Sequence, residues 1–144
     1  MSGDAAEFVG RFADGWARPE GGARLLPLLH PEVRLVQPVD GEVRGHDGAR
    51  AFFDRTFGLI PDLRGEVLRW ATGEDLLLIE LRLYGTIVGG RPVEWVTSDH
   101  IRLENGLVRE RVARFDPTPI LVAALRSPRA WPRIVRDTVA RMRA

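Results

Sequence analysis

Two glycine-containing dipeptides in the second half of the chain most constrain its fold. Gly89-Gly90 and Asn105-Gly106 each stand between stretches in which apolar and polar residues alternate. Such dipeptides adopt the positive φ angles that two-residue hairpin turns require. The pattern therefore predicts an antiparallel meander, and its expected strands are residues 64–71, 76–88, 91–104 and 107–115.

Helical periodicity surrounds this meander. Apolar residues recur at helical spacing, and the segments concerned are residues 4–16, 25–29, 49–60, 120–126 and 128–142. One short strand is expected at residues 33–37, and residues 41–45 are expected to form a loop. The order predicts an α+β fold with helices packed on one face of the sheet. A length of 144 residues fits one domain, and we expect a core at about 7–128 and a C-terminal helix at 129–142.

Composition excludes several kinds of site. The chain has no cysteine, which removes disulfides, thiolate nucleophiles and Cys-ligated zinc. Its three histidines are scattered without metal-ligand spacing, so we expect neither a metal nor a cofactor. A net charge of +1 argues against nucleic-acid binding. No apolar run could span a membrane, and the first residues do not resemble a signal peptide, so we expect a cytoplasmic protein that does not bind membranes.

Charge is concentrated at the C-terminal end. Residues 126–144 hold six arginines and one aspartate, and every basic residue in the chain is arginine, a bias typical of high-GC bacterial genes. The basic side of the last helix could face an acidic partner or membrane, but an exposed face on a docked amphipathic helix is more common. We therefore expect the other side of this helix to be buried; its residues are Trp131, Ile134, Val135, Thr138 and Val139.

Four short motifs, in this order and spacing, carry a family resemblance. They are Leu28-Leu29-His30-Pro31-Glu32-Val33-Arg34-Leu35, Gly45-His46-Asp47, Ser98-Asp99-His100-Ile101-Arg102-Leu103 and Phe115-Asp116-Pro117. Together they resemble the SnoaL-like proteins of the nuclear-transport-factor-2-like superfamily, over about residues 7–128. The resemblance implies a cone-shaped, curved antiparallel sheet that N-terminal helices wrap around an apolar pocket. The family includes polyketide cyclases, steroid isomerases, epoxide hydrolases, dehydratases and members that only bind, so the fold does not give the chemistry.

The two hairpins assign a face to each residue of the meander. A two-residue loop at Gly89-Gly90 would pair Val88 with Arg91, and one at Asn105-Gly106 would pair Glu104 with Leu107. The mostly apolar face, taken as the pocket wall, is then Leu77, Ile79, Leu81, Leu83, Val96, Ser98, His100, Arg111, Ala113 and Phe115. The opposite face is Glu80, Arg82, Tyr84, Trp95, Thr97, Asp99, Glu110, Val112 and Arg114.

On this register His100 and Arg111 are neighbours in the pocket. A guanidinium disfavours a second positive charge, so a neutral His100 could act as a general base. Arg111 could then stabilise an oxyanion, while Gln37 and Ser98 orient the substrate by hydrogen bonds. The alternative is that His100 and Arg111 line the wet rim of the cone and do no chemistry.

The resemblance also implies which acids are absent. Gln37 stands where the steroid-isomerase branch has its catalytic carboxylate, and Val96 where that branch has an acidic donor. Leu81 and Ala113 match the two acids of the epoxide-hydrolase branch. Aromatic residues expected in the pocket are Phe12, Trp16, Phe53 and Phe115, and with Leu81 and Val96 they suit a flat or polycyclic ligand.

Two functions remain open from the sequence. The first is an enzyme that transfers protons on an apolar carbonyl compound, with polycyclic compounds among the candidates, by isomerisation, cyclisation or dehydration. The second is a non-catalytic ligand-binding or dimeric interaction module of the same fold. The charged opposite face, with Tyr84 and Trp95, also predicts a homodimer through that face.

Overall fold

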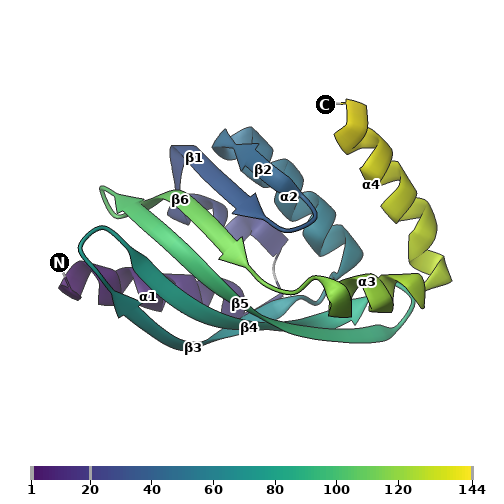
Figure 1. Cartoon of the computed structure of the whole chain (residues 1–144), viewed down its shortest axis with the longest axis horizontal. Coiled ribbons are helices and arrows are strands. Elements are labelled where there is room, and N and C mark those ends of the chain that lie inside the picture. The colour runs from purple at the N-terminus through teal and green to yellow at the C-terminus, as the bar shows by residue number, and fades with distance from the viewer. Residues whose placement is uncertain (1, 20, 144) are drawn as a thin grey trace.

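The computed structural model describes residues 2–19 and 21–143, and it confirms the predicted α+β class (Figure 1). Three residues of the predicted domain lie outside the described residues: Met1 and Ala144 at its limits, and Glu20 within it. The helices are α1 (Ser2–Ala17), α2 (Gly45–Leu59), α3 (Thr118–Leu125) and α4 (Trp131–Arg143), with short 3₁₀ turns η1 (Gly21–Arg24), η2 (Leu26–Leu28) and η3 (Pro128–Ala130). The strands are β1 (Leu29–Gln37), β2 (Gly41–Arg44), β3 (Arg64–Thr72), β4 (Leu77–Ile87), β5 (Arg91–Glu104) and β6 (Leu107–Arg114).

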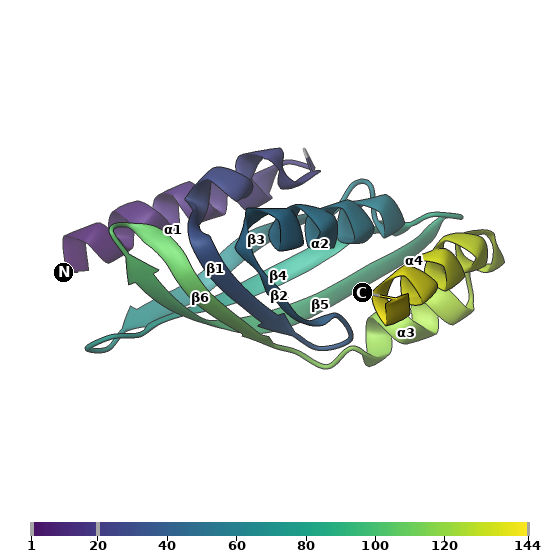
Figure 2. The ribbon, with the colours of Figure 1, turned by 90° about the horizontal axis from the view of Figure 1, so that it is seen from above.

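One curved sheet holds all six strands, in the order β2-β1-β6-β5-β4-β3. Helices α1 and α2 cover one face of it, which we call the inner face, and α3 and α4 stand at one end (Figures 1 and 2). Every strand pair is antiparallel except β1 with β6, which is parallel. The segment expected as a loop at residues 41–45 instead forms β2, which pairs with β1 as a hairpin, and then opens α2.

The aromatic stripe of α1 anchors the helix to the sheet. Phe8, Phe12 and Trp16 recur every fourth residue, and all three are buried. Their rings meet in sequence, with centroids 5.8 Å and then 6.4 Å apart. Burial of such side chains contributes roughly 1.5–3 kcal/mol each, so this stripe is what holds α1 across the cone.

The register between β4 and β5 differs by one residue from the prediction. Ile87 pairs with Arg91, so the turn has three residues, Val88, Gly89 and Gly90, and both glycines have positive φ angles (107° and 97°). A shift of one residue moves every side chain of a strand to the other face. The predicted face of β5 is therefore wrong.

The second hairpin follows the prediction at its turn and departs from it further on. Glu104 pairs with Leu107 around Asn105-Gly106, whose φ angles are 54° and 76°. A bulge then places an extra residue in β6, so that Ile101, not His100, pairs with Arg111. Arg111 and Ala113 consequently stay on the inner face, as predicted.

Inner and outer residues of β5 are exchanged as a result. Trp95, Thr97, Asp99 and Ile101 are buried on the inner face, whereas Val96, Ser98 and His100 lie on the outer face. The prediction that Asp99 and Trp95 face outward is thus wrong, and so is the predicted pairing of His100 with Arg111.

The C-terminal helix is present, but its predicted burial is largely wrong. Trp131, Val135 and Val139 are 46%, 62% and 40% exposed, and Ile134 and Thr138 are half-buried. The helix follows η3 and stands at the end of the domain rather than on its body (Figure 2). Only one side of it can therefore reach the core.

Candidate functional site

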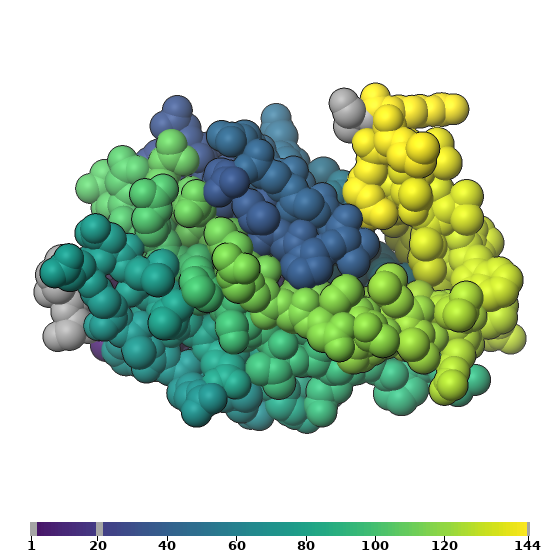
Figure 3. Space-filling view, viewed as in Figure 1, coloured from purple at the N-terminus to yellow at the C-terminus, as the bar shows by residue number. Residues whose placement is uncertain are grey.

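A mainly apolar cavity of about 180 Å³ lies at the end of the sheet where α3 and α4 stand. Its wall combines α2, the ends of α1 and β1, single residues of β4 and β5, the second half of β6, and residues of α3 and α4. The lining side chains discussed in the following paragraphs are Trp16, Gln37, Asp40, Phe53, Arg55, Trp95, Arg111, Ala113, Phe115, Ile134, Asp137 and Arg141. Figure 3 shows a hollow between the turn that joins β1 to β2 and helix α4, at the mouth of this cavity.

A buried ion pair on the inner face of the sheet contributes one side chain to the cavity wall. Arg111 Nε donates to Asp99 Oδ2 at 2.8 Å, and Thr97 Oγ1 donates to Asp99 Oδ1 at 2.9 Å. Asp99 is 0% exposed and Arg111 is 9% exposed, and only Arg111 lines the cavity. Within the described part of the chain, Nη1 and Nη2 of Arg111 have no hydrogen-bond partner. Asp99 and Thr97 therefore position a guanidinium whose remaining donors can bind a ligand oxygen.

Three side chains of the wall each carry a buried polar atom without a partner. These atoms are Trp16 Nε1, Trp95 Nε1 and Gln37 Oε1. Gln37 uses its other end, because Nε2 donates to the carbonyl oxygen of Gly41 at 2.6 Å. Buried polar groups in proteins are nearly always hydrogen-bonded, so three such atoms in the side chains of one wall make this wall the candidate site.

An aspartate at the mouth joins three elements. Asp40 Oδ1 accepts from Arg55 Nε of α2 at 3.3 Å and from Arg141 Nη1 of α4 at 3.0 Å. The preceding Val39 has φ +75°, and the N–H of Asp40 donates to the carbonyl oxygen of Pro38 at 2.9 Å. This three-residue turn is strained for a β-branched residue, and such strain clusters at functional sites.

The structure brings together some of the residues expected in the site. Trp16, Gln37, Phe53, Arg111 and Phe115 line the cavity. Phe12 lines a narrow gap of about 20 Å³ beside it, which also touches Arg111. Leu81 is fully buried on the inner face but does not line the cavity.

Three expected residues lie elsewhere. Val96, Ser98 and His100 are on the outer face of the sheet, where His100 has Leu78 and Val112 as cross-strand neighbours. Their predicted place in the pocket is wrong because β5 is shifted by one residue. The argument for His100 as a base beside Arg111 is lost with it.

Sequence reasoning missed Thr97, Asp99 and Trp95 for the same reason, and it missed Asp40 and Arg55. The sequence does contain one signal for which side chains of β5 face inward. Its odd-numbered residues include Val93, Trp95 and Ile101, whereas its even-numbered ones are mostly polar or charged. The larger apolar content of the odd set favours the inner face. For Asp40 and Arg55, 15 positions apart in the chain, no pattern indicates the contact.

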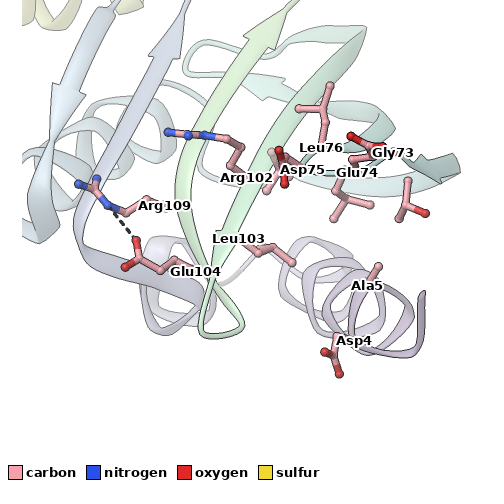
Figure 4. Close-up of a pocket in the computed structure, with 13 residues that line it drawn as sticks. Asp4, Ala5, Gly73, Glu74, Asp75, Leu76, Arg102, Leu103, Glu104 and Arg109 are labelled. Atoms are coloured by element: carbon pink, nitrogen blue, oxygen red, sulfur yellow. Dashed lines mark ion pairs between the residues drawn. The ribbon is translucent and has the colours of Figure 1, made fainter. Parts of the chain in front are cut away.

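Another hollow, of about 570 Å³, lies at the opposite end of the sheet (Figure 4). It is lined by the start of α1, the turn between β3 and β4, and the end of β5, and Arg109 pairs there with Glu104 at 3.2 Å. Its charged side chains are largely exposed, so water already satisfies them. Among the described residues no group of three His, Asp or Glu side chains could hold a metal.

Comparison with known proteins identifies the family and agrees with the fold. A model of the SnoaL-like domain matches residues 9–111, which is more than half of the chain. A search of curated proteins gave no match. No helix among residues 2–19 and 21–143 has the length and apolar character needed to cross a membrane.

Solved structures show the same fold at low sequence identity. A protein described as a SnoaL-like polyketide cyclase, from Jannaschia sp. CCS1, is 24% identical with TM-score 0.72, covering 83% of this chain and 90% of its own. A ketosteroid-isomerase-like protein from Catenulispora acidiphila, bound to trimethylamine, is 18% identical with TM-score 0.72, covering 81% and 91%. An epoxide hydrolase from M. tuberculosis is 16% identical with TM-score 0.67, covering 89% and 94%. The chain belongs to the SnoaL-like domain family, and its fold is that of these solved structures.

Proposed function

We propose that this protein binds a small apolar carbonyl compound in the cavity beneath α3 and α4. The observation that carries the proposal is Arg111, which Asp99 holds in the wall with donors to spare. A carbonyl oxygen is the group that such donors bind in an otherwise apolar wall. The volume of the cavity favours a single ring over the polycyclic ligand that the sequence suggests. A cavity of about 150 Å³ holds benzene, so about 180 Å³ suits a single substituted ring.

Binding is favoured over catalysis because each carboxylate described in the wall, Asp40 and Asp137, is paired with arginine. Histidine does not line the cavity, and Asp40 accepts from two arginines. The predicted absence of a cofactor and the cytoplasmic location stay predictions.

The binding test uses acetophenone as the probe and NMR line broadening or calorimetry as the readout. We expect saturable binding to the wild type and its loss in Ala113→Leu, because the added atoms fill the cavity. Val112→Leu is the matched control, since Val112 is the next residue on β6 and faces outward. Equal binding by both variants would place the ligand outside this cavity.

Proton transfer is a second candidate function, favoured by the strained turn that holds Asp40 at the mouth. Asp40 would remove a proton from the carbon next to the ligand carbonyl; the C–H electron pair would form a carbon–carbon double bond as the carbonyl π pair moves onto oxygen. Arg111 would stabilise that oxyanion. For a β,γ-unsaturated ketone, return of the proton from Asp40 to the γ carbon would move the double bond and complete an isomerisation, with no other reactant needed.

Removal of α4 is expected to affect ligand binding more than stability. A chain ending at Ala130 keeps η3 but loses three wall residues, Ile134, Asp137 and Arg141. Since α4 buries none of its side chains fully, we expect the free energy of unfolding to fall by no more than about 2 kcal/mol. Affinity for acetophenone should fall at least fivefold, as measured by the same titration. A larger loss of stability with unchanged affinity would show that α4 is structural.

The outer face is proposed as the surface of a homodimer. Leu78 and Val96 are 40% and 44% exposed there, among charged side chains that include the pair of Arg82 with Glu94. Light scattering at micromolar concentration should give twice the mass of the chain, 16.1 kDa. Val96→Arg should give monomers without unfolding, because its charge would be buried in the interface beside Arg82, the cross-strand neighbour of residue 96. A monomeric wild type would contradict the proposal.

A further inference from the structure

We infer that helix α4 docks the protein on a membrane surface that carries anionic lipids. The inference goes beyond the proposed binding function and does not depend on it. It rests on the outward side of α4, where Trp131, Val135, Val139 and Met142 are 46%, 62%, 40% and 82% exposed. Each follows the one before it by three or four positions, so the four form one line along the helix, which we call the apolar stripe.

Packing within the domain does not explain the apolar stripe. The other side of α4 faces the cavity, where Ile134, Asp137 and Arg141 form part of the wall. A helix at the edge of a globular domain needs one apolar side, which is the side that meets the domain. A second apolar side in water is unfavourable until something covers it, so adjoining exposed apolar residues mark an interaction surface.

The charge around the apolar stripe is positive. Residues 126–143 hold six arginines and one aspartate, a net charge of +5, whereas the rest of the chain has a net charge of −4. Arg136 and Arg143 are exposed, and each directly follows a residue of the stripe, which places both on its flank. A basic helix with an exposed apolar side that includes tryptophan is typical of helices that bind the interface of anionic membranes.

Shape and charge favour a lipid surface over a protein as the occupant. Helix α4 stands out from the end of the domain (Figure 3), and the apolar stripe lines none of the hollows described above. It therefore presents a ridge, to which fluid lipid adapts, whereas a protein partner must match its shape. A second copy of the chain would bring the same arginines together, and like charges repel.

Trp131 can enter an apolar surrounding without losing a hydrogen bond. Its Nε1 already donates to the carbonyl oxygen of Ala124 at 3.1 Å, so no donor is left unpaired when the ring leaves water. Leu125, the next residue after Ala124, is 70% exposed and adds an apolar side chain near the start of the stripe. The 13 residues of α4 extend about 20 Å, less than the hydrocarbon core of about 30 Å, so the helix would lie along the surface.

Cosedimentation of the 144-residue chain with vesicles tests the inference. The probes are vesicles of phosphatidylcholine alone and of phosphatidylcholine mixed equally with phosphatidylglycerol. We expect at least tenfold tighter binding to the mixed vesicles, and loss of this preference at about 1 M salt. Equal binding to both kinds of vesicle would overturn the inference. Binding to neither would also overturn it and leave an acidic protein surface as the alternative occupant.

Val135→Gln tests the apolar stripe without changing the charge. It should weaken binding to the mixed vesicles about tenfold, because one apolar side chain no longer enters the lipid. Leu68→Gln is the matched control, since Leu68 is 46% exposed on the edge strand β3 and should leave binding unchanged. Both variants should melt at the wild-type temperature, because both side chains are exposed. Unchanged binding by Val135→Gln, or equal loss in both variants, would contradict the inference.

A pair of charge variants tests the arginines. Arg136→Gln with Arg143→Gln should weaken binding to the mixed vesicles roughly fivefold for each arginine. Arg69→Gln with Arg102→Gln removes the same charge from β3 and β5, where the two side chains are 80% and 55% exposed, and should have little effect. Equal loss from the two pairs would mean that net charge alone drives binding and that α4 does not dock.

Light scattering without vesicles tests the remaining occupant, a second copy of the chain. We expect the same mass for the wild type and for Val135→Gln. A lower mass for the variant would show that another copy covers the apolar stripe, and would overturn the inference.

Discussion

Replacement of Asp99 by asparagine is expected to lower the free energy of unfolding by about 3–5 kcal/mol. Asp99 is 0% exposed and neutralises Arg111, which is 9% exposed, through a 2.8 Å hydrogen bond. Asparagine keeps the shape but leaves the guanidinium charge buried without a counter-charge. Urea unfolding followed by circular dichroism measures the change. Asp47→Asn is a matched control, since that carboxylate is exposed and pairs only with Arg50 on the surface.

A double-variant cycle shows whether the two charges act as a pair. Arg111→Met alone should cost a similar amount, because it leaves Asp99 buried and unpaired. Asp99→Leu alone should cost at least as much, and Asp99→Leu with Arg111→Met should recover most of the loss, since the double variant removes both buried charges. If the two single effects simply add in the double variant, Asp99 and Arg111 are not coupled and Arg111 needs another explanation.

The same cycle separates stability from function. An apolar pair of similar volume is often at least as stable as a buried ion pair, so packing alone does not require Asp99 and Arg111. The stable double variant should nevertheless fail to bind acetophenone, because the donors of Arg111 are gone. That outcome would give the ion pair a binding role rather than a structural one.

Several parts of the fold were readable from the sequence because they depend on local spacing. The stripe Phe8, Phe12 and Trp16 predicts a helix docked on one side, and all three side chains are buried. Asn105-Gly106 predicts a tight turn, and both residues have the positive φ angles that such a turn requires. These signals lie within a few residues of one another and need no knowledge of the rest of the chain.

The site was harder to predict because its register depends on single residues. One extra residue in the turn at Val88, Gly89 and Gly90 moved the whole of β5 to the other face. Asp99 also looks like a surface residue by type, because a carboxylate is rarely buried unless it is paired. Its partner Arg111 lies 12 positions away, beyond a bulge that no sequence pattern indicated. Buried charge pairs across strands therefore escape an analysis of spacing alone.

Replacement of Asp40 by asparagine distinguishes the two proposed functions. If Asp40 accepts a proton from the ligand, the variant should lose about 10²- to 10⁴-fold in turnover, the usual contribution of a general base. Asparagine keeps an oxygen for Arg55 and Arg141 but cannot take up the proton. The assay is NMR of acetophenone in D₂O, in which exchange of the methyl hydrogens for deuterium reports proton removal without knowledge of the natural substrate.

Arg141→Gln is the control that makes this result specific. It breaks the contact of α4 with Asp40 and leaves the carboxylate in place, supported by Arg55. Exchange that is lost in Asp40→Asn and retained in Arg141→Gln would assign the proton transfer to the carboxylate. Equal loss in both variants would mean that closure of the mouth by α4 matters, and not the base. If the wild type binds acetophenone but exchanges its methyl hydrogens no faster than background, the pocket binds its ligand without reaction. Arg111 would then polarise the carbonyl, but no base would lie close enough to remove the proton.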